Sequence, residues 1–355
     1  MIVTIIVFVL ILGILVFIHE LGHFTVAKKL GIRVEEFGFG LPPRIWGKKK
    51  GETIYSINAL PIGGFVRLAG EDPDEISQKL TPTEKRRLFW ARSKKERAAV
   101  LLAGVTMNFL LAVAIISFIF TQGVYVPTDR VHIEKVIADS PAETAGIKEK
   151  DEVISFAGKT IANSEELIQI TKENAGKEVI LEVDRNGQPF SFTLTPRVDP
   201  PADQGPLGIV ISNLEERKYP WYQAPFYGTI EALKMSYIML ATFGSLVWRL
   251  VTFQAINVDV AGPIGIAQAT GQAVQVGANA VLQLMGILSL NLAIVNLLPI
   301  PALDGGRLMF VILEKFLGRR VKPRAELIAH QIGMAFLLAL ILLITVNDVL
   351  RILRG

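Results

Sequence analysis

The chain begins with MIVTIIVFVLILGILVFIHELGH at residues 1–23, the stretch that decides the fold. Its first 18 residues are almost all apolar, close to the roughly 20 that a helix needs to cross a bilayer core. His19, Glu20 and His23 then form an HExxH pattern. Helical spacing of four places both imidazoles on one face, where they can share one metal ion. The stretch therefore predicts a membrane-spanning helix that ends in part of a metal site.

Other apolar blocks extend this prediction to the whole chain. Apolar residues make up 51% of the 355 residues, and the mean hydropathy of +0.43 argues against a soluble protein. Three further blocks could span a bilayer, namely residues 98–121, 281–303 and 332–346. A fifth stretch, 226–253, is apolar but carries three charged side chains. The absence of cysteine excludes a thiol nucleophile and any Cys-ligated metal site.

The basic residues predict how the chain crosses the membrane. They cluster between the first two blocks, at 48–50, 85–87 and 92–97. Basic residues near spans stay in the cytoplasm, so the first helix should run inward and the second outward. We therefore expect the lipid bilayer as the partner of these charges and no nucleic acid.

The fifth stretch leaves two topologies open. If it spans, the basic loop after residue 306 falls outside, against the positive-inside rule. If it lies flat on the outer surface as an amphipathic helix, that loop falls inside. The second reading gives four spans in a multi-pass bacterial inner-membrane protein, with both termini outside. It predicts eight segments: span 1–26, cytoplasmic loop 27–97, span 98–122, outer domain 128–198, outer linker and interfacial helix 199–280, span 281–305, cytoplasmic loop 306–328 and span 329–350.

A catalytic zinc ion takes three protein ligands and keeps one position for water, so HExxH needs a third partner. Asp304 ends the third predicted span, which also runs inward, and therefore reaches the inner leaflet beside His19 and His23. His330, near the inner start of the last span, is a weaker candidate. Within HExxH the intervening Glu20 is the usual general base.

Three features together resemble the site-2 protease family, most closely the bacterial RseP-type intramembrane proteases. They are HELGH at 19–23, NLAIVNLLPIPALDGG at 291–306, and the outer segment described below. The resemblance implies one zinc ion held by His19, His23 and Asp304, with Glu20 as the base. It also implies that Asn291 and Asn296 hold the substrate backbone or the oxyanion. Two positions depart from the family: Val105 stands where Pro usually follows Gly104, and Arg307 stands where His is common.

The resemblance also implies an activity. Such enzymes cut single-span membrane proteins after a first cut outside, and thereby release anti-sigma factors or clear remnant signal peptides. The rival hypothesis is a non-enzymatic membrane scaffold that binds peptides and holds a structural metal.

The cytoplasmic loop suggests how a substrate could be held. Residues 34–40 and 54–66 read as short strands with turns at Pro42-Pro43 and Gly63-Gly64. The family has a GxG motif in a membrane-dipping β-hairpin here, which matches Gly38, Phe39 and Gly40. It implies that the substrate adds to this hairpin as a strand, whereas an ordinary amphipathic hairpin is the plain alternative.

The outer segment completes the predicted fold. Residues 128–198 read as four strands with a helix from Ser164, and SPAETAGI followed by KEKDEVISFAGKTI resembles a bacterial PDZ domain. Such a domain binds peptide ends or filters substrates by size, and the sequence does not separate these roles. The expected fold is an α-helical membrane protein with four transmembrane helices, a membrane-dipping β-hairpin and an inserted extracytoplasmic PDZ-like α+β domain.

Overall fold

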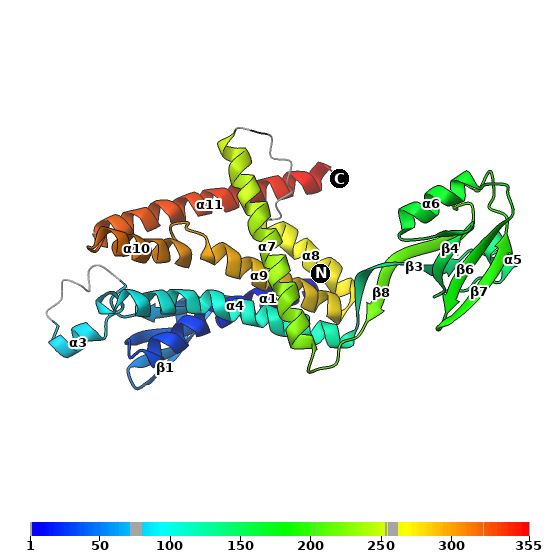
Figure 1. Ribbon diagram of the computed structural model, residues 1–355. Helices are drawn as coiled ribbons and strands as arrows, with labels where there is room; N and C mark the ends of the chain where they lie inside the picture. Colours follow the sequence, from blue (N-terminus) through cyan, green and yellow to red (C-terminus); the bar gives the residue numbers. More distant parts are fainter. Residues whose placement is uncertain are drawn as a thin grey trace. The chain divides into compact units, whose positions relative to one another are not determined.

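The computed structural model describes residues 2–71, 80–201, 203–252, 254, 262–321 and 323–354. The chain divides into two compact units (Figure 1). One unit is helical and comprises Met1–Ile119 with Pro220–Gly355, and the other is built around a sheet and comprises Phe120–Tyr219.

Long apolar helices dominate the helical unit. Five helices in the described part of the chain are long and apolar enough to cross a membrane. They are α1 (Ile2–Lys29), α4 (Lys94–Gln122), α7 (Ala224–Val251), α9 (Ala278–Leu297) and α11 (Pro323–Arg354). Helices cover the first, second and fourth predicted spans, and α7 covers the fifth stretch. Helix α9 covers the third span only as far as Leu297, so Asp304 lies beyond the end of this helix instead of ending it. Figure 1 shows α7 running across the direction of α4, α9 and α11.

Local chemistry explains where α4 begins and how it meets α1. The Ser93 hydroxyl accepts a hydrogen bond from the Glu96 backbone N–H, and the Glu96 carboxylate accepts one from the Ser93 N–H, which forms a capping box. Further along, a Cβ atom at Gly22 of α1 would collide with the Ala103 carbonyl of α4. Glycine therefore lets the two backbones approach closely, as small residues do between membrane helices.

A long β-hairpin follows α1. Strands β1 (Val34–Lys50) and β2 (Thr53–Leu68) pair antiparallel and turn at Gly51, whose φ of 64° suits glycine. The pairing partners show that the chain also reverses near both predicted turns, because Glu36 and Lys49 both pair with Ile54, and Phe39 pairs with both Ile57 and Gly64. Each strand therefore contains two paired segments that run in opposite directions, joined at Pro42-Pro43 in β1 and just before Gly64 in β2.

The pairing within this hairpin corrects the expectation for Gly38 and Phe39. Gly38 pairs with Ser56 on one side and with Phe65 on the other, and Phe39 pairs with Ile57 and Gly64. The segment around Gly38 and Phe39 is therefore internal to the sheet, because the long β2 strand folds around it. The Gly40 carbonyl accepts a hydrogen bond from the Asn58 amide. An added strand cannot pair with Gly38 or Phe39 without displacing one of these neighbours.

Two further helices occupy regions predicted to be irregular. Helix α8 (Pro263–Val276) lies inside the expected outer linker and begins with proline, which favours the first turn of a helix. Helix α10 (Asp304–Leu317) replaces most of the expected loop 306–328 and ends at Gly318 in a left-handed conformation. The short helices α3 (Pro82–Arg86) and η1 (Phe89–Ala91) lead into α4.

A buried apolar cluster joins the elements that surround the predicted metal site. It comprises Ala27, Ile32, Val34, Leu68, Phe89, Val100, Leu101 and Val311. These residues come from α1, the chain that follows it, the base of the hairpin, η1, α4 and α10. Burial of their side chains stabilises the packing by roughly 25 cal/mol per Å² of apolar surface, and fixes the ends of α1 and α4 against each other.

The other unit is an α+β domain with a twisted sheet. Its strand order is β7-β6-β4-β3-β8, with β5 beside β4. The strands are β3 (Val124–Val136), β4 (Glu152–Phe156), β5 (Lys159–Thr160), β6 (Val179–Arg185), β7 (Gln188–Leu194) and β8 (Ile209–Arg217), and the helices are α5 (Pro141–Ala145) and α6 (Ser164–Glu173). The predicted boundary at residue 198 was too early, because β8 pairs with β3 over most of its length.

Candidate metal centre

Three metal-ligating side chains meet in the helical unit. The His19 and His23 Nε2 atoms lie 3.1 Å apart, and Asp304 Oδ2 lies 2.9 Å from the first and 3.2 Å from the second. Both histidines are buried and Asp304 is half-buried. Two imidazole nitrogens and one carboxylate oxygen are a donor set that suits catalytic zinc.

The outer hydrogen bonds of the histidines show which nitrogens are free. The His23 Nδ1 atom lies 2.8 Å from the Val100 carbonyl, so Nδ1 carries the proton and Nε2 of the neutral ring carries a lone pair. Nε2 of His23 and Oδ2 of Asp304 then present lone pairs to one point. Such an arrangement is repulsive without a cation, and it is the arrangement that a metal ion requires.

Helix α4 shapes the space beside the imidazoles. A Cβ atom at Gly104 would lie 2.5 Å from His23 Nε2 and 2.7 Å from His19 Nε2. One turn later, the buried Asn108 amide lies 3.2 Å from His19 Nδ1 while its Oδ1 has no partner. Turning this amide over lets Oδ1 accept the His19 Nδ1 proton and leaves Nε2 of His19 free. The residues therefore fit a zinc ion.

A tight turn between α9 and α10 presents Asp304. Cβ atoms at Gly305 and Gly306 would collide with the carbonyls of Leu298 and Ile300, so only glycine lets α10 fold back onto this turn. Ala302 within the turn has a φ of 80°, a strained value for a residue with a side chain. The DGG sequence thus fixes the position of Asp304 through close backbone contacts.

His330 has a different place from the one predicted as an alternative ligand. Its Nδ1 accepts a hydrogen bond from the Ala302 N–H at 2.7 Å, so it supports the turn rather than joining the three donors. One turn along α11, a Cβ atom at Gly333 would lie 2.5 Å from the Pro301 carbonyl oxygen. Helix α11 therefore braces the turn that carries Asp304.

A cavity of about 270 Å³ adjoins the three donors. Glu20 and Asn296 line it, as do Val66 and Leu68 of β2. Asn291 is exposed on α9 and does not line this cavity, so of the two predicted asparagines only Asn296 is brought to the metal site. Glu20 lies close to the edge of the hairpin, because a Cβ atom at Gly64 would be 3.7 Å from its Cγ.

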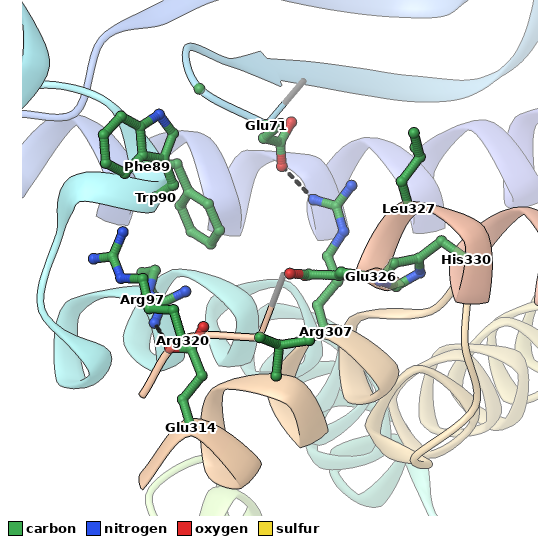
Figure 2. Close-up of a pocket in the computed structure, with 12 residues that line it drawn as sticks. Glu71, Phe89, Trp90, Arg97, Arg307, Glu314, Arg320, Glu326, Leu327 and His330 are labelled. Carbon is green, nitrogen blue, oxygen red and sulfur yellow. Dashed lines mark hydrogen bonds and ion pairs between the residues drawn. The ribbon is translucent and has the colours of Figure 1, made fainter. Parts of the chain in front are cut away.

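An ion pair forms the wall of the cavity on the side of α10. Figure 2 shows the Arg307 guanidinium donating to the Glu71 carboxylate. The neighbouring Glu71 carboxylate raises the pKa of Arg307 above its ordinary value, so this side chain stays charged. The position where the family commonly has His therefore holds a permanent cation.

Two residues at this site had no predicted role. Gly104 was noted only as the neighbour of the departure at Val105, and Asn108 was given no role. Their spacing of four puts both on one helix face, which is the signal that could have placed them against His19 and His23. The contact of Gly104 with the imidazoles depends on how α1 packs on α4, which no local pattern specifies.

Comparison with known proteins supports a single family. The profile described as "Peptidase family M50" matches residues 7–340. The zinc metalloprotease RasP of Oceanobacillus iheyensis is 31% identical over 98% of this chain and 99% of its own length. The regulator of sigma-W protease RasP of Bacillus subtilis is 30% identical over 98% of this chain and 99% of its own length.

Among solved structures, the PDZ domain of an SdrC-like protein from Listeria monocytogenes is similar to part of the chain. It shares 19% sequence identity with a TM-score of 0.22, and the match covers 25% of this chain and 95% of that domain. The two RasP relatives and the family profile, by contrast, extend over nearly the whole sequence. With HExxH on α1 and its donors converging on Asp304, the chain belongs to peptidase family M50, the site-2 proteases, and is an intramembrane zinc metalloprotease.

Proposed function

We propose that His19, His23 and Asp304 hold the zinc ion and that Glu20 is the general base of an endopeptidase. Its substrates are single-span membrane proteins that have already been cut outside the membrane. The observation that carries this proposal is the convergence of three donor atoms from α1 and α10, which are far apart in the sequence. A relative named as a regulator of sigma-W protease supports anti-sigma factors as one substrate class, beside remnant signal peptides.

The side chains have separate roles in peptide hydrolysis. A bound zinc ion supplies Lewis-acid activation of water and of the scissile carbonyl. Glu20 takes the proton from the attacking water and delivers it to the leaving amine nitrogen. The Asn296 amide, which lines the same cavity, donates to the oxygen that becomes negative in the tetrahedral intermediate. Asn291 is exposed, so any contact it makes with substrate lies away from this cavity.

The hairpin offers the substrate an edge at residues 64–68 rather than at Gly38. This segment is the outer strand of the sheet, because its partner on the inner side is residues 34–39. Val66 and Leu68 within it line the cavity beside Glu20. An extended peptide that pairs with this edge would have its backbone beside the zinc donors. Its hydrogen bonds to the strand would replace those that a helical substrate loses when it unwinds.

We place four helices across the membrane and α7 flat on the outer surface. Helix α7 is the least hydropathic of the five candidates and runs across the direction of the others (Figure 1). Both observations favour an interfacial helix over a fifth span. The hairpin and α10 then lie at the cytoplasmic face, and the sheet unit and both termini lie outside.

The sheet unit carries a groove suited to an extended peptide. Strand β8 is the last strand of the sheet, and an apolar hollow of about 500 Å³ runs between it and α6. Ile211 of β8 and Ile168 of α6 line this hollow. The arrangement supports a PDZ-like role in which a peptide end pairs with β8, with a size filter as the alternative.

Single cysteines test both proposals, because the native chain contains none. Cysteine at Trp221 and at Thr252, which flank α7, should both react with a membrane-impermeant maleimide added outside intact cells, while cysteine at Lys50 should not. Labelling at only one end of α7 would show a fifth span.

Cysteine at Ile211 should also react from outside, and a peptide bound in the groove should protect it. Labelling that no peptide affects would favour the size filter.

Replacing Asp304 by Ala tests the metal site. Loss of a ligand should lower zinc affinity more than the ~10–100-fold typical of residues that only support ligands. Zinc content per chain should fall, and cleavage of a membrane reporter should fall with it. The matched control is His132→Ala, a histidine of β3, which should keep its zinc. Full zinc content in Asp304→Ala would remove Asp304 from the ligand set. A native chain that binds zinc but cleaves no reporter would instead favour the scaffold hypothesis.

A further inference from the structure

A second cavity lies on the other side of the Glu71–Arg307 ion pair. It measures about 250 Å³, and both residues of the ion pair line it as well as the catalytic cavity. Figure 2 shows its side chains arriving from η1, α4, α10 and α11. Nothing in the proposed mechanism uses this cavity.

Charged groups in this cavity are unequally paired. Arg97 and Glu314 form a buried ion pair, and Arg307 is paired with Glu71. Arg320 makes no ion pair with a carboxylate in the described ranges, and its guanidinium lies 5.5 Å from the centre of the Trp90 ring. Burial lowers the pKa of the Arg320 guanidinium most, and the nearby positive charge of Arg97 lowers it further. Arg320 therefore adds a positive charge beside the paired Arg97 and Glu314.

Two residues that line this cavity carry unpaired N–H groups. Buried Trp90 Nε1 and Arg97 Nε both lack a hydrogen-bond partner in the described structure, and both atoms can only donate. A buried donor without a partner costs about 1–3 kcal/mol. A ligand that satisfies these groups must therefore bring acceptor oxygens and negative charge. A third carboxylate, Glu326, extends from α11 toward the middle of the cavity (Figure 2), where its charge interacts with Arg307 and Arg97.

We propose that Trp90, Arg97 and Arg320 bind the phosphate group of an anionic ligand. Phosphate matches the geometry of guanidinium donors and supplies several acceptors at once. A shallow hollow shared by Trp90 and Arg320 leads outward past Lys85, Arg86 and Arg92, whose charges attract an anion to the entrance.

The surroundings favour a phospholipid headgroup as the source of this phosphate. Helix α10, which supplies Glu314, exposes four apolar side chains: Ile312, Leu313, Phe316 and Leu317. They would contact acyl chains while the phosphate occupies the cavity. Basic pockets between helices at the cytoplasmic side of a membrane bind anionic lipid headgroups. This choice of source depends on the proposed topology, whereas binding of the phosphate does not.

Binding measurements on the zinc-loaded full chain in detergent test this site. Short-chain phosphatidylglycerol, phosphatidylcholine and inorganic phosphate are titrated separately, with native mass spectrometry as the readout. We expect saturable binding of phosphatidylglycerol that is about tenfold tighter than that of phosphatidylcholine. Both lipids carry the phosphate, but the choline ammonium adds a positive charge beside the guanidinium groups. Arg320→Gln should weaken this binding at least about tenfold, and Trp90→Phe should weaken it severalfold while keeping the ring.

Lys50→Gln is the matched control, since it removes one exposed positive charge at the tip of the hairpin and should change binding less than twofold. Saturation by inorganic phosphate with the same sensitivity to Arg320→Gln would support the site and identify free phosphate as its source. Equal effects of Arg320→Gln and Lys50→Gln, or no saturable binding of any probe, would overturn the proposal and leave a water-filled cavity. Because the readout is binding, these outcomes are independent of proteolytic activity.

Discussion

Replacing Glu20 by Gln lowers the rate of peptide cleavage by about 10³-fold or more while zinc stays bound. General base catalysis contributes typically about 10²–10⁴-fold, and Gln has the size of Glu but cannot accept the proton of water. The three donor atoms on His19, His23 and Asp304 do not include Glu20, so metal content should be unchanged. Single-turnover cleavage of a membrane reporter and zinc analysis of the same sample measure both effects.

The control for this experiment is Glu231→Gln on α7, where the carboxylate is far more exposed and cleavage should be unaffected. Unchanged cleavage by Glu20→Gln would refute the assignment of the base. Loss of zinc in this variant would show instead that Glu20 supports the metal, and the low rate would then say nothing about proton transfer.

The inactive Glu20→Gln chain also allows the substrate to be located. Because the protein has no cysteine, a single cysteine at Arg67 on the outer strand of the hairpin can be cross-linked to a cysteine near the scissile bond of the substrate. The same cysteine at Phe39 should fail, since this residue pairs on both sides within the sheet. Cross-linking through Phe39 rather than Arg67 would restore the edge that the GxG motif predicted.

The sequence predicted those parts of the site that depend on local spacing. Four residues between His19 and His23 specify a shared face wherever a helix forms. Asp304 followed from the direction of the helices, since the basic segments predicted that both α1 and α9 end at the inner leaflet. The structure brings these three side chains together, while their roles as zinc ligands remain predictions.

Features that depend on tertiary contacts were predicted poorly. The hairpin was expected to expose Gly38 because each strand was read alone, but β2 is long enough to pair with both sides of β1. Helix α10 was missed because its basic residues were read as a loop signal, although Gly318 provides an ordinary helix end. His330 was weighed as a ligand because histidine binds metals, whereas its contact with the turn at Ala302 requires knowledge of how α11 packs.

Replacing Gly104 by Ala should have the second large effect, through the geometry of the metal site rather than its chemistry. The new methyl group would lie 2.5 Å from His23 Nε2 and 2.7 Å from His19 Nε2, so both rings must move. They cannot move freely, because His23 is held by the Val100 carbonyl and His19 by Asn108, both on α4 itself. Overpacking of this kind costs about 1–3 kcal/mol, and each 1.4 kcal/mol is a tenfold change in affinity.

We therefore expect the Gly104→Ala chain to bind zinc about 5- to 150-fold more weakly. Cleavage should fall further, since a displacement of about 1 Å in a catalytic group can cost 10²-fold in rate. Zinc titration against a competing chelator, with cleavage measured at saturating zinc, separates the two losses. The matched control is Gly244→Ala on α7, where an added Cβ meets no atom within 4 Å and both measurements should match the native chain. A Gly104→Ala chain with native zinc affinity and native cleavage would mean that α4 does not approach the imidazoles as closely as the packing at Gly22 and Gly104 requires.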